Sequence, residues 1–536
     1  AQQIVSGKVI DTKGAAIAGA NIFIQGTYDG ETSAEDGSFS FKTSAEGEQV
    51  LVVSFLSFQT QQISLLVSKM KNLQIVLKED LNSLDAVIIN AGTFEAGDKS
   101  RVSVLKPLDI VTTAGSAGNI IAALQTLPGT QTVGESGRLF VRGGEAGETQ
   151  TFVDGLRVSQ PYNASVQNIP SRGRFSPFLF SGISFSTGGY SAEYGNALSG
   201  ILLLNTENEV SQEKTEISLM TVGAGIGNTQ KWEHESLNVN GSYINLAPYM
   251  ALAPQNINWN HPYQSLSGEA VYRNSLKKGI WKVYAAFDAS TFDFNREASD
   301  FTSTERIELK NNNFYFNTSY NGNFGDKWQI ISGLSYGYNL DNVHFNEDKI
   351  SDQEQAVHLK NKLSKRISES VKLSFGADFF STDFQENYDA SEMPAVKNNF
   401  QEILFALYSE ADIRFSKNFA LKAGMRGTYN ALFKESYLSP RLSLAYKTSK
   451  SAQFSVAYGN FVQTPGQEYL KYTQNLTSEK AAHYIVNYQF QKENTLLRLE
   501  AYYKRYNNLI TYSGTENQFS NLQNTGKGYA KGLDLF

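Results

Sequence analysis

The side chains that most often carry catalysis are either missing from this chain or spaced without a recognisable pattern. The 536 residues include no cysteine and five histidines, His234, His261, His344, His358 and His483. Without cysteine there is no disulfide, no thiolate metal site and no cysteine nucleophile. No two histidines stand four residues apart around a glutamate, so the helical zinc-protease pattern is absent. We therefore expect no catalytic site, no bound metal and no cofactor.

Two other classes of function are disfavoured by sequence and charge. No serine lies in a nucleophile elbow, and Gly223, Gly225 and Gly227 lack the spacing and the βαβ context of a dinucleotide-binding loop. Acidic residues (53) outnumber basic residues (47), which gives a net charge of −6. Such a balance provides no overall field for binding a polyanion. The sequence thus indicates neither an enzyme nor a nucleic-acid-binding protein.

Most of the chain is predicted to form strands, and these strands must position its charged side chains. No stretch approaches the ~18 to 20 consecutive apolar residues of a membrane helix. Aromatic residues are frequent, with 28 Tyr and 34 Phe, and glycine occurs 43 times. From residue 211 onward, apolar or aromatic residues alternate with polar ones, as in 280–287 and 371–379. Alternation in strands of ~10 residues is typical of a transmembrane β-barrel, and we count about fifteen such strands in 211–536.

Three zones precede this alternating half. Residues 1–79 predict a small β-sandwich of short strands, with turns at 13–14 and 36–37. Residues 80–97 predict a linker that contains one apolar island. Residues 98–208 predict an α+β unit with a helix over 117–125, strands at 139–142 and 151–154, and many glycines. The expected fold class is therefore mostly β, with a sandwich, an α+β unit and an antiparallel barrel.

Four segments of the α+β unit, 123–130, 139–144, 151–155 and 190–200, carry motifs in a fixed order. Their marked residues are Pro128, Gly129, Arg142, Gly143, Gly144, Asp154, Gly155, Glu193, Tyr194 and Gly195. This unit resembles the plug domain of TonB-dependent outer-membrane transporters, and segments 438–446, 457–465 and 528–535 resemble barrel strands of the same family. Segments 6–11, 17–22 and 35–39 resemble the carboxypeptidase-regulatory-like domain, without the residues of a peptidase. This combination resembles TonB-dependent receptors of the Bacteroidetes type.

The resemblance implies a role for the apolar island. Leu84, Asp85, Ala86, Val87, Ile88, Ile89 and Asn90 stand where relatives carry the TonB box. In such a protein TonB, energised from the inner membrane, pairs with the box as an added strand and pulls the plug open for a bound ligand. The implied location is the outer membrane, with the sandwich and the box in the periplasm. The implied partners are TonB, membrane lipid and an unidentified imported ligand. Composition alone also allows an ordinary linker strand.

Arg142 and Glu193 are the plug charges that we expect to pair with the barrel. A plug inside a polar barrel needs charge partners that hold it and still release it, and breaking one partner of a buried pair costs ~3 to 5 kcal/mol. Ordinary surface charge is the alternative interpretation. Gly143, Gly144, Gly155 and Gly195 are expected to serve backbone geometry and not to touch a ligand.

Two features depart from the family pattern. Segments 186–193 and 198–204 lack the runs typical of SusC-type receptors, so we do not predict a typical SusC protein, although a surface lipoprotein or another outer-membrane protein stays among the partners considered. Residues 211–536 are also too few for the roughly 22 strands of a family barrel, so we expect an incomplete barrel; a complete barrel of roughly fourteen or sixteen strands is the alternative. Active import is the leading function, and a docking subunit of a larger outer-membrane complex is the second.

Overall fold

The computed structural model describes most of the chain. The described residues are 3–78, 93–97 and 107–535, apart from gaps at 13, 18, 26, 28, 35, 56–57, 59–60, 117, 134–135, 167–168, 211, 254–256, 298–302, 326, 369, 392–393, 417, 450, 493–494 and 515–518. Residues 84–90, the predicted TonB box, lie outside them, so that assignment stays a prediction. The chain divides into two compact units, Ala1–Ile88 and Ile89–Phe536.

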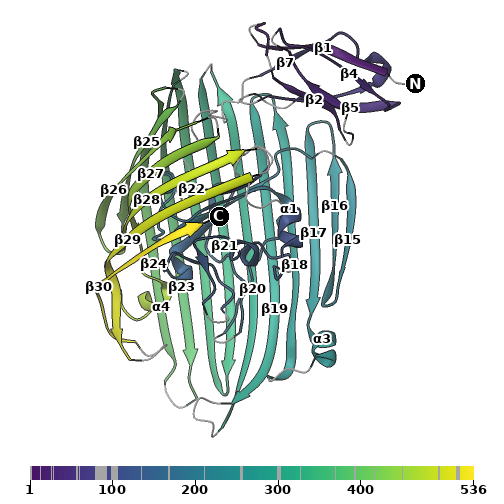
Figure 1. Cartoon of the computed structure of the whole chain (residues 1–536). Helices are drawn as coiled ribbons and strands as arrows, with labels where there is room; N and C mark the ends of the chain where they lie inside the picture. The colour runs from purple at the N-terminus through teal and green to yellow at the C-terminus, as the bar shows by residue number, and fades with distance from the viewer. Residues whose placement is uncertain are drawn as a thin grey trace. The chain divides into compact units, whose positions relative to one another are not determined.

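The first unit is a small β-sandwich, as its sequence predicts (Figure 1). One sheet has the order β4 (Ser38–Thr43), β1 (Gln3–Asp11) and β7 (Leu73–Leu77); the other has the order β3 (Gly30–Thr32), β2 (Asn21–Ile24), β5 (Glu48–Ser54) and β6 (Gln61–Leu66), followed by the short helix η1 (Val67–Lys69). Val5, Ile22 and Val53 lie in its buried core. Strand β3 was not predicted, because its three residues are all exposed and show no alternation.

Residues 93–210 form what we call the plug segment. Its main sheet has the order β12 (Leu156–Val158), β11 (Thr149–Val153), β14 (Gly200–Thr206), β13 (Phe180–Ser186) and β8 (Thr93–Gly97). Around it lie α1 (Pro107–Thr112), α2 (Ile120–Leu124), β9 (Thr130–Gln131), β10 (Phe140–Val141), η2 (Ala146–Glu148) and η3 (Pro177–Leu179). Helix α2 is shorter than the helix predicted over 117–125. It begins after Asn119, whose Oδ1 accepts from the N–H of Ile121 at 2.8 Å and thereby caps the helix.

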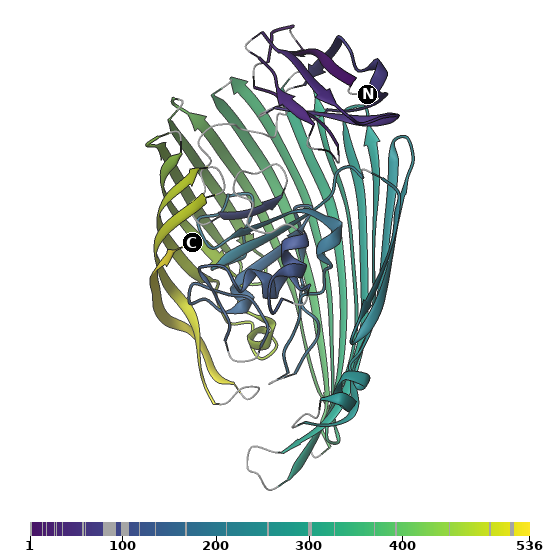
Figure 2. The ribbon, with the colours of Figure 1, turned by 45° about the vertical axis from the view of Figure 1, so that its right-hand side comes forward.

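The rest of the chain forms one antiparallel sheet, which we call the wall. Its sixteen strands follow sequence order: β15 (Lys214–Met220), β16 (Gly223–Lys231), β17 (Glu235–Asn245), β18 (Asn258–Leu276), β19 (Gly279–Glu297), β20 (Thr304–Phe324), β21 (Trp328–Phe345), β22 (Asp348–Ser368), β23 (Val371–Asp389), β24 (Val396–Arg414), β25 (Phe419–Asn430), β26 (Glu435–Lys447), β27 (Ala452–Gln463), β28 (Glu479–Lys492), β29 (Thr495–Ser513) and β30 (Ser520–Leu535). Helices α3 (Ala247–Leu252) and α4 (Gln467–Leu470) lie in connections between strands. The wall curves strongly (Figure 2), and among the described residues no pairing joins β15 to β30.

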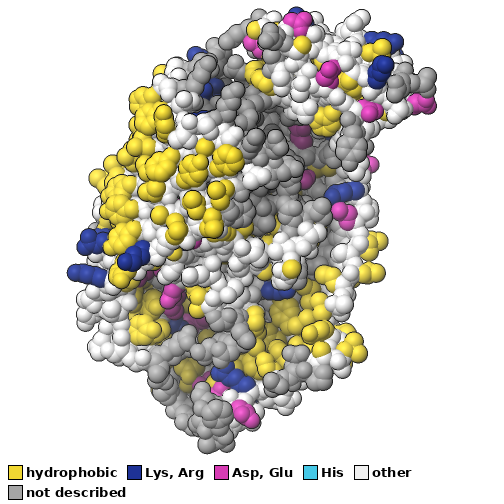
Figure 3. All heavy atoms as spheres, viewed as in Figure 1, with side chains coloured by type: hydrophobic (Ala, Val, Ile, Leu, Met, Phe, Trp, Pro, Cys, Tyr) yellow, Lys and Arg dark blue, Asp and Glu magenta, His cyan; other side chains and the backbone are white. Residues whose placement is uncertain are grey.

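The two faces of the wall differ in chemistry because successive side chains of a strand point to opposite sides. Leu407 and Leu438 are 70% and 74% exposed on the outer face, whereas their neighbours Ala406 and Ser439 are buried. Hydrophobic side chains gather over the outer face on the left of Figure 3. An apolar outer band with a polar interior is the pattern of a barrel that faces lipid. In the described part of the chain, no helix has the length and apolar character needed to cross a membrane.

The plug segment lies against the concave face of the wall (Figure 2). A shared apolar cluster joins Leu124, Phe180 and Leu202 of the plug segment to Val271 and Tyr284 of the wall. Two further apolar clusters also join the two parts, one that includes Tyr190 and Phe461 and one that includes Ile169 and Phe292. Polar side chains form the other contacts between plug segment and wall, which are described below.

Candidate functional site

Arg142 joins the plug segment to the last two wall strands. It follows β10 with a φ of 48°, and its buried guanidinium pairs with Glu500 on β29 and with Asp534 on β30, where Nη2 lies 2.8 Å from Oδ2. Nη1 also donates to the carbonyl of Thr187 at 3.3 Å. Burial lowers the pKa of Arg142, but the charges of Glu500 and Asp534 outweigh that effect and raise its pKa above the ordinary value. The side chain therefore stays charged while it is buried.

A lysine from the wall extends this contact. Lys504 Nζ donates to Ser199 Oγ at 2.7 Å and lies 3.5 Å from the carbonyl oxygen of Arg142. Glu148 accepts from Ser199 and, at 2.9 Å, from the hydroxyl of Tyr506. A Cβ on Gly144 would lie 1.9 Å from Ser199 Oγ, so this turn packs closely only with glycine.

Glu193 makes the second ionic contact between the plug segment and the wall. Its Oε1 lies 2.8 Å from Lys360 Nζ, and its Oε2 pairs with Lys362, both on β22. Burial raises the pKa of Glu193, but the two ammonium groups outweigh burial and hold it far below the ordinary value. Lys360 also lies 4.6 Å from the centroid of the Tyr194 ring.

Two arginines of the wall hold the backbone around Glu193. Arg426 Nη1 donates to the carbonyl of Glu193 at 3.0 Å and pairs with Asp378 Oδ2 at 2.9 Å. Arg441 Nη1 donates to the carbonyl of Tyr194 at 2.7 Å. A Cβ on Gly195 would lie 2.5 Å from Arg426 Nε, which explains the glycine at this position.

The motif residues Asp154 and Gly155 belong to a third contact. Both have positive φ, 50° and 81°, and form the tight turn between β11 and β12. Asp154 Oδ1 accepts from the Thr206 N–H at 3.0 Å and lies 3.2 Å from Lys282 Nζ on β19. Asp154 thus shapes its own turn and pairs with the wall.

The structure brings some predicted site residues together and separates others. Pro128 and Gly129 form the turn after α2, and the carbonyl of Gly129 accepts from the Arg142 N–H at 3.0 Å. Gly143 follows with a φ of 73°. Five of the ten predicted plug residues therefore lie at one contact, while Glu193, Tyr194 and Gly195 lie at the second and Asp154 and Gly155 at the third.

Sequence reasoning missed the wall residues that complete these contacts, such as Arg426, Arg441, Lys504 and His358. The Arg157 N–H donates to His358 Nδ1 at 3.0 Å, so the other ring nitrogen carries the proton toward Asp378 Oδ1, 3.3 Å away. In the sequence, each of these residues is a charged or ionisable residue at an inward position of an alternating strand. This pattern can identify the wall residue of a contact, but not the plug residue that it meets.

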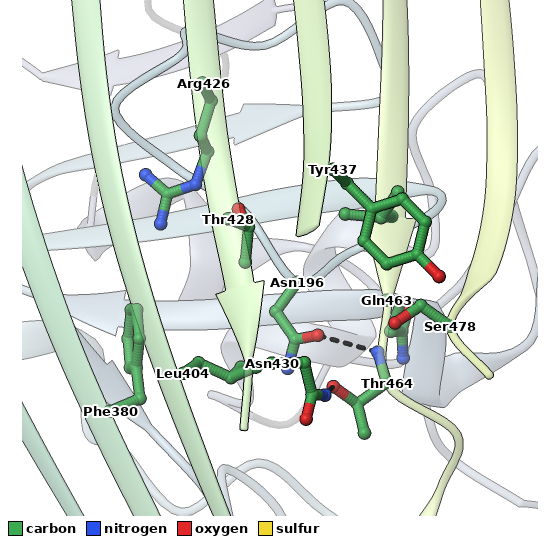
Figure 4. A pocket seen from close by; sticks show the side chains of 11 residues that line it. Asn196, Phe380, Leu404, Arg426, Thr428, Asn430, Tyr437, Gln463, Thr464 and Ser478 are labelled. Atoms are coloured by element: carbon green, nitrogen blue, oxygen red, sulfur yellow. Dashed lines mark hydrogen bonds between the residues drawn. The ribbon is translucent and has the colours of Figure 1, made fainter. Parts of the chain in front are cut away.

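Residues 464–478, which we call the strap, connect β27 to β28 and touch the plug segment. The Thr464 N–H donates to Asn196 Oδ1 at 2.8 Å (Figure 4). Asn196, Arg426, Asn430 and Gln463 are among the residues that line a small pocket beside this contact. The space open to the centre of a water molecule is about 20 Å³, which is room for about one water. The pocket is therefore too small for an imported ligand.

The described residues also contain no group of three His, Cys, Asp or Glu side chains arranged to hold a metal ion. The three contacts around Arg142, Asp154 and Glu193 instead join the wall to the plug segment. Their chemistry is ion pairing and carbonyl binding, which hold the plug segment against the wall.

Three family models match the chain in the order that the sequence predicts. Residues 5–89 match the CarboxypepD_reg-like domain, residues 98–201 match the TonB-dependent Receptor Plug Domain, and residues 254–536 match the TonB dependent receptor-like β-barrel. The β-barrel match covers more than half of the chain.

Relatives and solved structures agree with these matches. A segment is 30% identical over 170 residues to the TonB-dependent receptor SusC of Bacteroides thetaiotaomicron, covering 30% of this chain and 16% of that receptor. A TonB-dependent receptor of Formosa agariphila is 26% identical over 257 residues, covering 44% of this chain and 23% of that receptor. The matches thus span under a quarter of the length of these relatives.

Two solved structures share the fold at low sequence identity. The ferric enterobactin receptor PfeA of Pseudomonas aeruginosa has a TM-score of 0.62 at 14% identity, covering 83% of this chain and 77% of that chain. The outer membrane transporter YddB of Escherichia coli has a TM-score of 0.64 at 11% identity, covering 83% and 74%. The predicted mostly β fold, with its sandwich, plug and antiparallel wall, is confirmed.

Proposed function

Because the chain belongs to the TonB-dependent receptor family, we propose that it imports a ligand across the outer membrane by displacement of the plug segment. The observation that carries the proposal is the set of ion pairs between the plug segment and the wall. Arg142, Asp154 and Glu193 each pair with charged wall residues. Charged groups that separate can be hydrated by water, whereas a fully apolar interface would expose its whole surface to water on separation.

We propose that Leu84, Asp85, Ala86, Val87, Ile88, Ile89 and Asn90 form the TonB box in the periplasm. A β-competent segment just before the plug segment offers TonB a strand to pair with, and backbone hydrogen bonds supply affinity with few side-chain demands. Force on this segment would reach β8, which pairs with β13 in the plug sheet. The energy comes from TonB, and the protein catalyses no reaction.

The ligand would enter at the end of the wall that carries α3, α4 and the strap. SusC and PfeA are similar to this chain, and the name of PfeA describes a receptor for ferric enterobactin. A surface lipoprotein would be a partner if the chain worked as a SusC-type receptor.

A reversible cross-link tests displacement of the plug segment. A Cβ on Gly337 of β21 would lie 3.1 Å from Ser159 Oγ, the position that a cysteine sulfur at 159 would take. Disulfide geometry places a Cβ about 3 Å from the partner sulfur, so the double variant Ser159→Cys and Gly337→Cys should join plug and wall. Because the chain has no native cysteine, no other disulfide competes. We expect uptake by cells to stop when the pair is oxidised and to return on reduction.

Deletion of residues 84–90 provides the second test. We expect the deletion to abolish uptake while the protein still folds in the outer membrane. The single cysteine variants control for the substitutions themselves. Uptake that persists in both the oxidised double variant and the deletion would contradict import by plug displacement, and loss of a bound outer-membrane partner instead would favour the docking-subunit function.

A further inference from the structure

Three carboxylates gather on the inner face of the wall near the strap. Asp352 and Glu386 are directly opposite each other on β22 and β23, and Glu354 follows two residues after Asp352 on the same face. Glu354 is 3% exposed and Glu386 is 6% exposed. We call these three residues the acidic cluster.

The acidic cluster has more negative charge than the described residues around it balance. Lys471 of the strap places Nζ 2.5 Å from Glu386 Oε2. Glu354 Oε2 accepts from the neutral amides of Gln160, at 2.9 Å, and Gln467. In the part of the chain that the structure describes, Glu354 Oε1 is buried without a hydrogen-bond donor, as is one carboxylate oxygen of Asp352. A buried carboxylate oxygen without a donor is costly, so this site is built to receive a further donor or a cation.

The strap already places one cation at the acidic cluster. The ammonium of Lys471 lies against Glu386 and 5.3 Å from the centroid of the Tyr472 ring. A carboxylate combined with an aromatic face is an arrangement that recognises organic cations. Lys471 also belongs to a connection between strands, not to the wall, so it can leave without breaking the pairing of the sheet.

We propose that Asp352, Glu354 and Glu386 bind a protonated amine carried by the imported ligand, and that Lys471 occupies this subsite until the ligand displaces it. This proposal rests on the proposed import function and names the chemistry of its ligand. Glu354 also binds Gln160 of the plug segment. A ligand ammonium at Glu354 Oε1 would therefore share its carboxylate with the plug contact at Oε2, which links ligand binding to a contact that holds the plug segment.

The test measures binding of spermidine, a linear polyamine with three ammonium groups, to the full chain in detergent micelles by calorimetry. We expect Glu354→Gln and Glu386→Gln each to weaken spermidine binding about tenfold or more, because each removes one charge from a desolvated site. We expect Lys471→Ala to tighten binding, since the competing ammonium is gone. Lys397→Ala, an exposed lysine at the start of β24, is the matched control and should leave the affinity unchanged.

Three results would overturn the proposal: equal binding by the wild type and both glutamine variants, unchanged or weaker binding by Lys471→Ala, or preferential binding of the anion citrate. Circular dichroism on each variant shows whether weaker binding comes from loss of the subsite or from loss of the fold. If one glutamine variant does not fold, the affinity of Asp352→Asn for spermidine replaces its measurement. The binding assay needs no TonB. Spermidine binding without uptake would therefore contradict only the import function, and uptake without cation binding would contradict only this subsite.

Discussion

Lys360 Nζ and Glu193 Oε1 lie 2.8 Å apart, which joins β22 of the wall to the tight segment 190–200 of the plug. Lys362 contacts the same carboxylate, and Arg426 and Arg441 hold the neighbouring backbone carbonyls. Three wall cations thus contact Glu193 itself, and Arg441 holds the carbonyl of the next residue, Tyr194. Because of these contacts, we expect single substitutions in the segment around Glu193 to change the stability of the protein measurably.

Glu193→Gln should destabilise the protein at neutral pH. The change leaves the buried Lys360 and the partly buried Lys362 without this anionic partner, and loss of one member of a buried pair costs ~3 to 5 kcal/mol. The check is the free energy of unfolding in urea, measured in detergent micelles. An unchanged free energy would show that the pair is not coupled to stability.

The stability difference between the wild type and Glu193→Gln should depend on pH. The pKa of Glu193 is lowered in the folded protein from its ordinary value of 4.5. A group with a lowered folded pKa contributes stability above its unfolded pKa, and that contribution is lost as the pH falls through the folded pKa. The difference between the wild type and Glu193→Gln should therefore be largest near neutral pH and shrink below a pH of about 4.5. A difference that grows in acid would contradict this assignment.

Gly195→Ala should loosen the plug segment. The new Cβ would lie 2.5 Å from Arg426 Nε, so Arg426 must move away from the carbonyls of Ala192 and Glu193. Limited proteolysis of the plug segment should become faster. Gly147→Ala is the control, because a Cβ there meets no atom within 4 Å, and it should leave the cleavage rate unchanged.

Arg142→Lys should weaken the contact with β29 and β30 although it keeps the charge. The guanidinium reaches Glu500, Asp534 and the Thr187 carbonyl together, and a lysine cannot reproduce this fork. We expect a lower urea midpoint than in the wild type. Arg138→Lys, at an exposed position of the plug segment, is the control and should have little effect.

Leu407→Lys tests which face of the wall meets lipid. Leu407 is 70% exposed within β24, and a lysine on the lipid face near the middle of the bilayer costs ~2 to 4 kcal/mol. The check is folding efficiency into phospholipid vesicles. Ile413→Lys, on the same face near the end of the strand, should cost less, because the penalty falls toward the interface. Equal folding of Leu407→Lys and the wild type would contradict a lipid-facing position.

Much of the architecture followed from local pattern. The turns at 13–14 and 36–37 and the short strands predicted the sandwich, because the preference for turns and alternation acts over a few residues. About fifteen alternating strands were predicted and sixteen are present. The sequence analysis did not predict β3 and β8, nor α1, β9, β12, β13 and β14 of the plug segment. Apart from β13 and β14, these elements are too short to show a period.

The sequence by itself determined the classes of element and drew attention to Arg142 and Glu193, because alternation and charge in a glycine-rich motif are visible along the chain. Only the tertiary structure decided that Arg142 meets Glu500 and Asp534, that Glu193 meets Lys360 and Lys362, and that Lys471 reaches Glu386. These partners lie far apart in the chain, and strand pairing and the curvature of the wall bring them together. No local preference encodes such distances, since they depend on the register of all the strands between them.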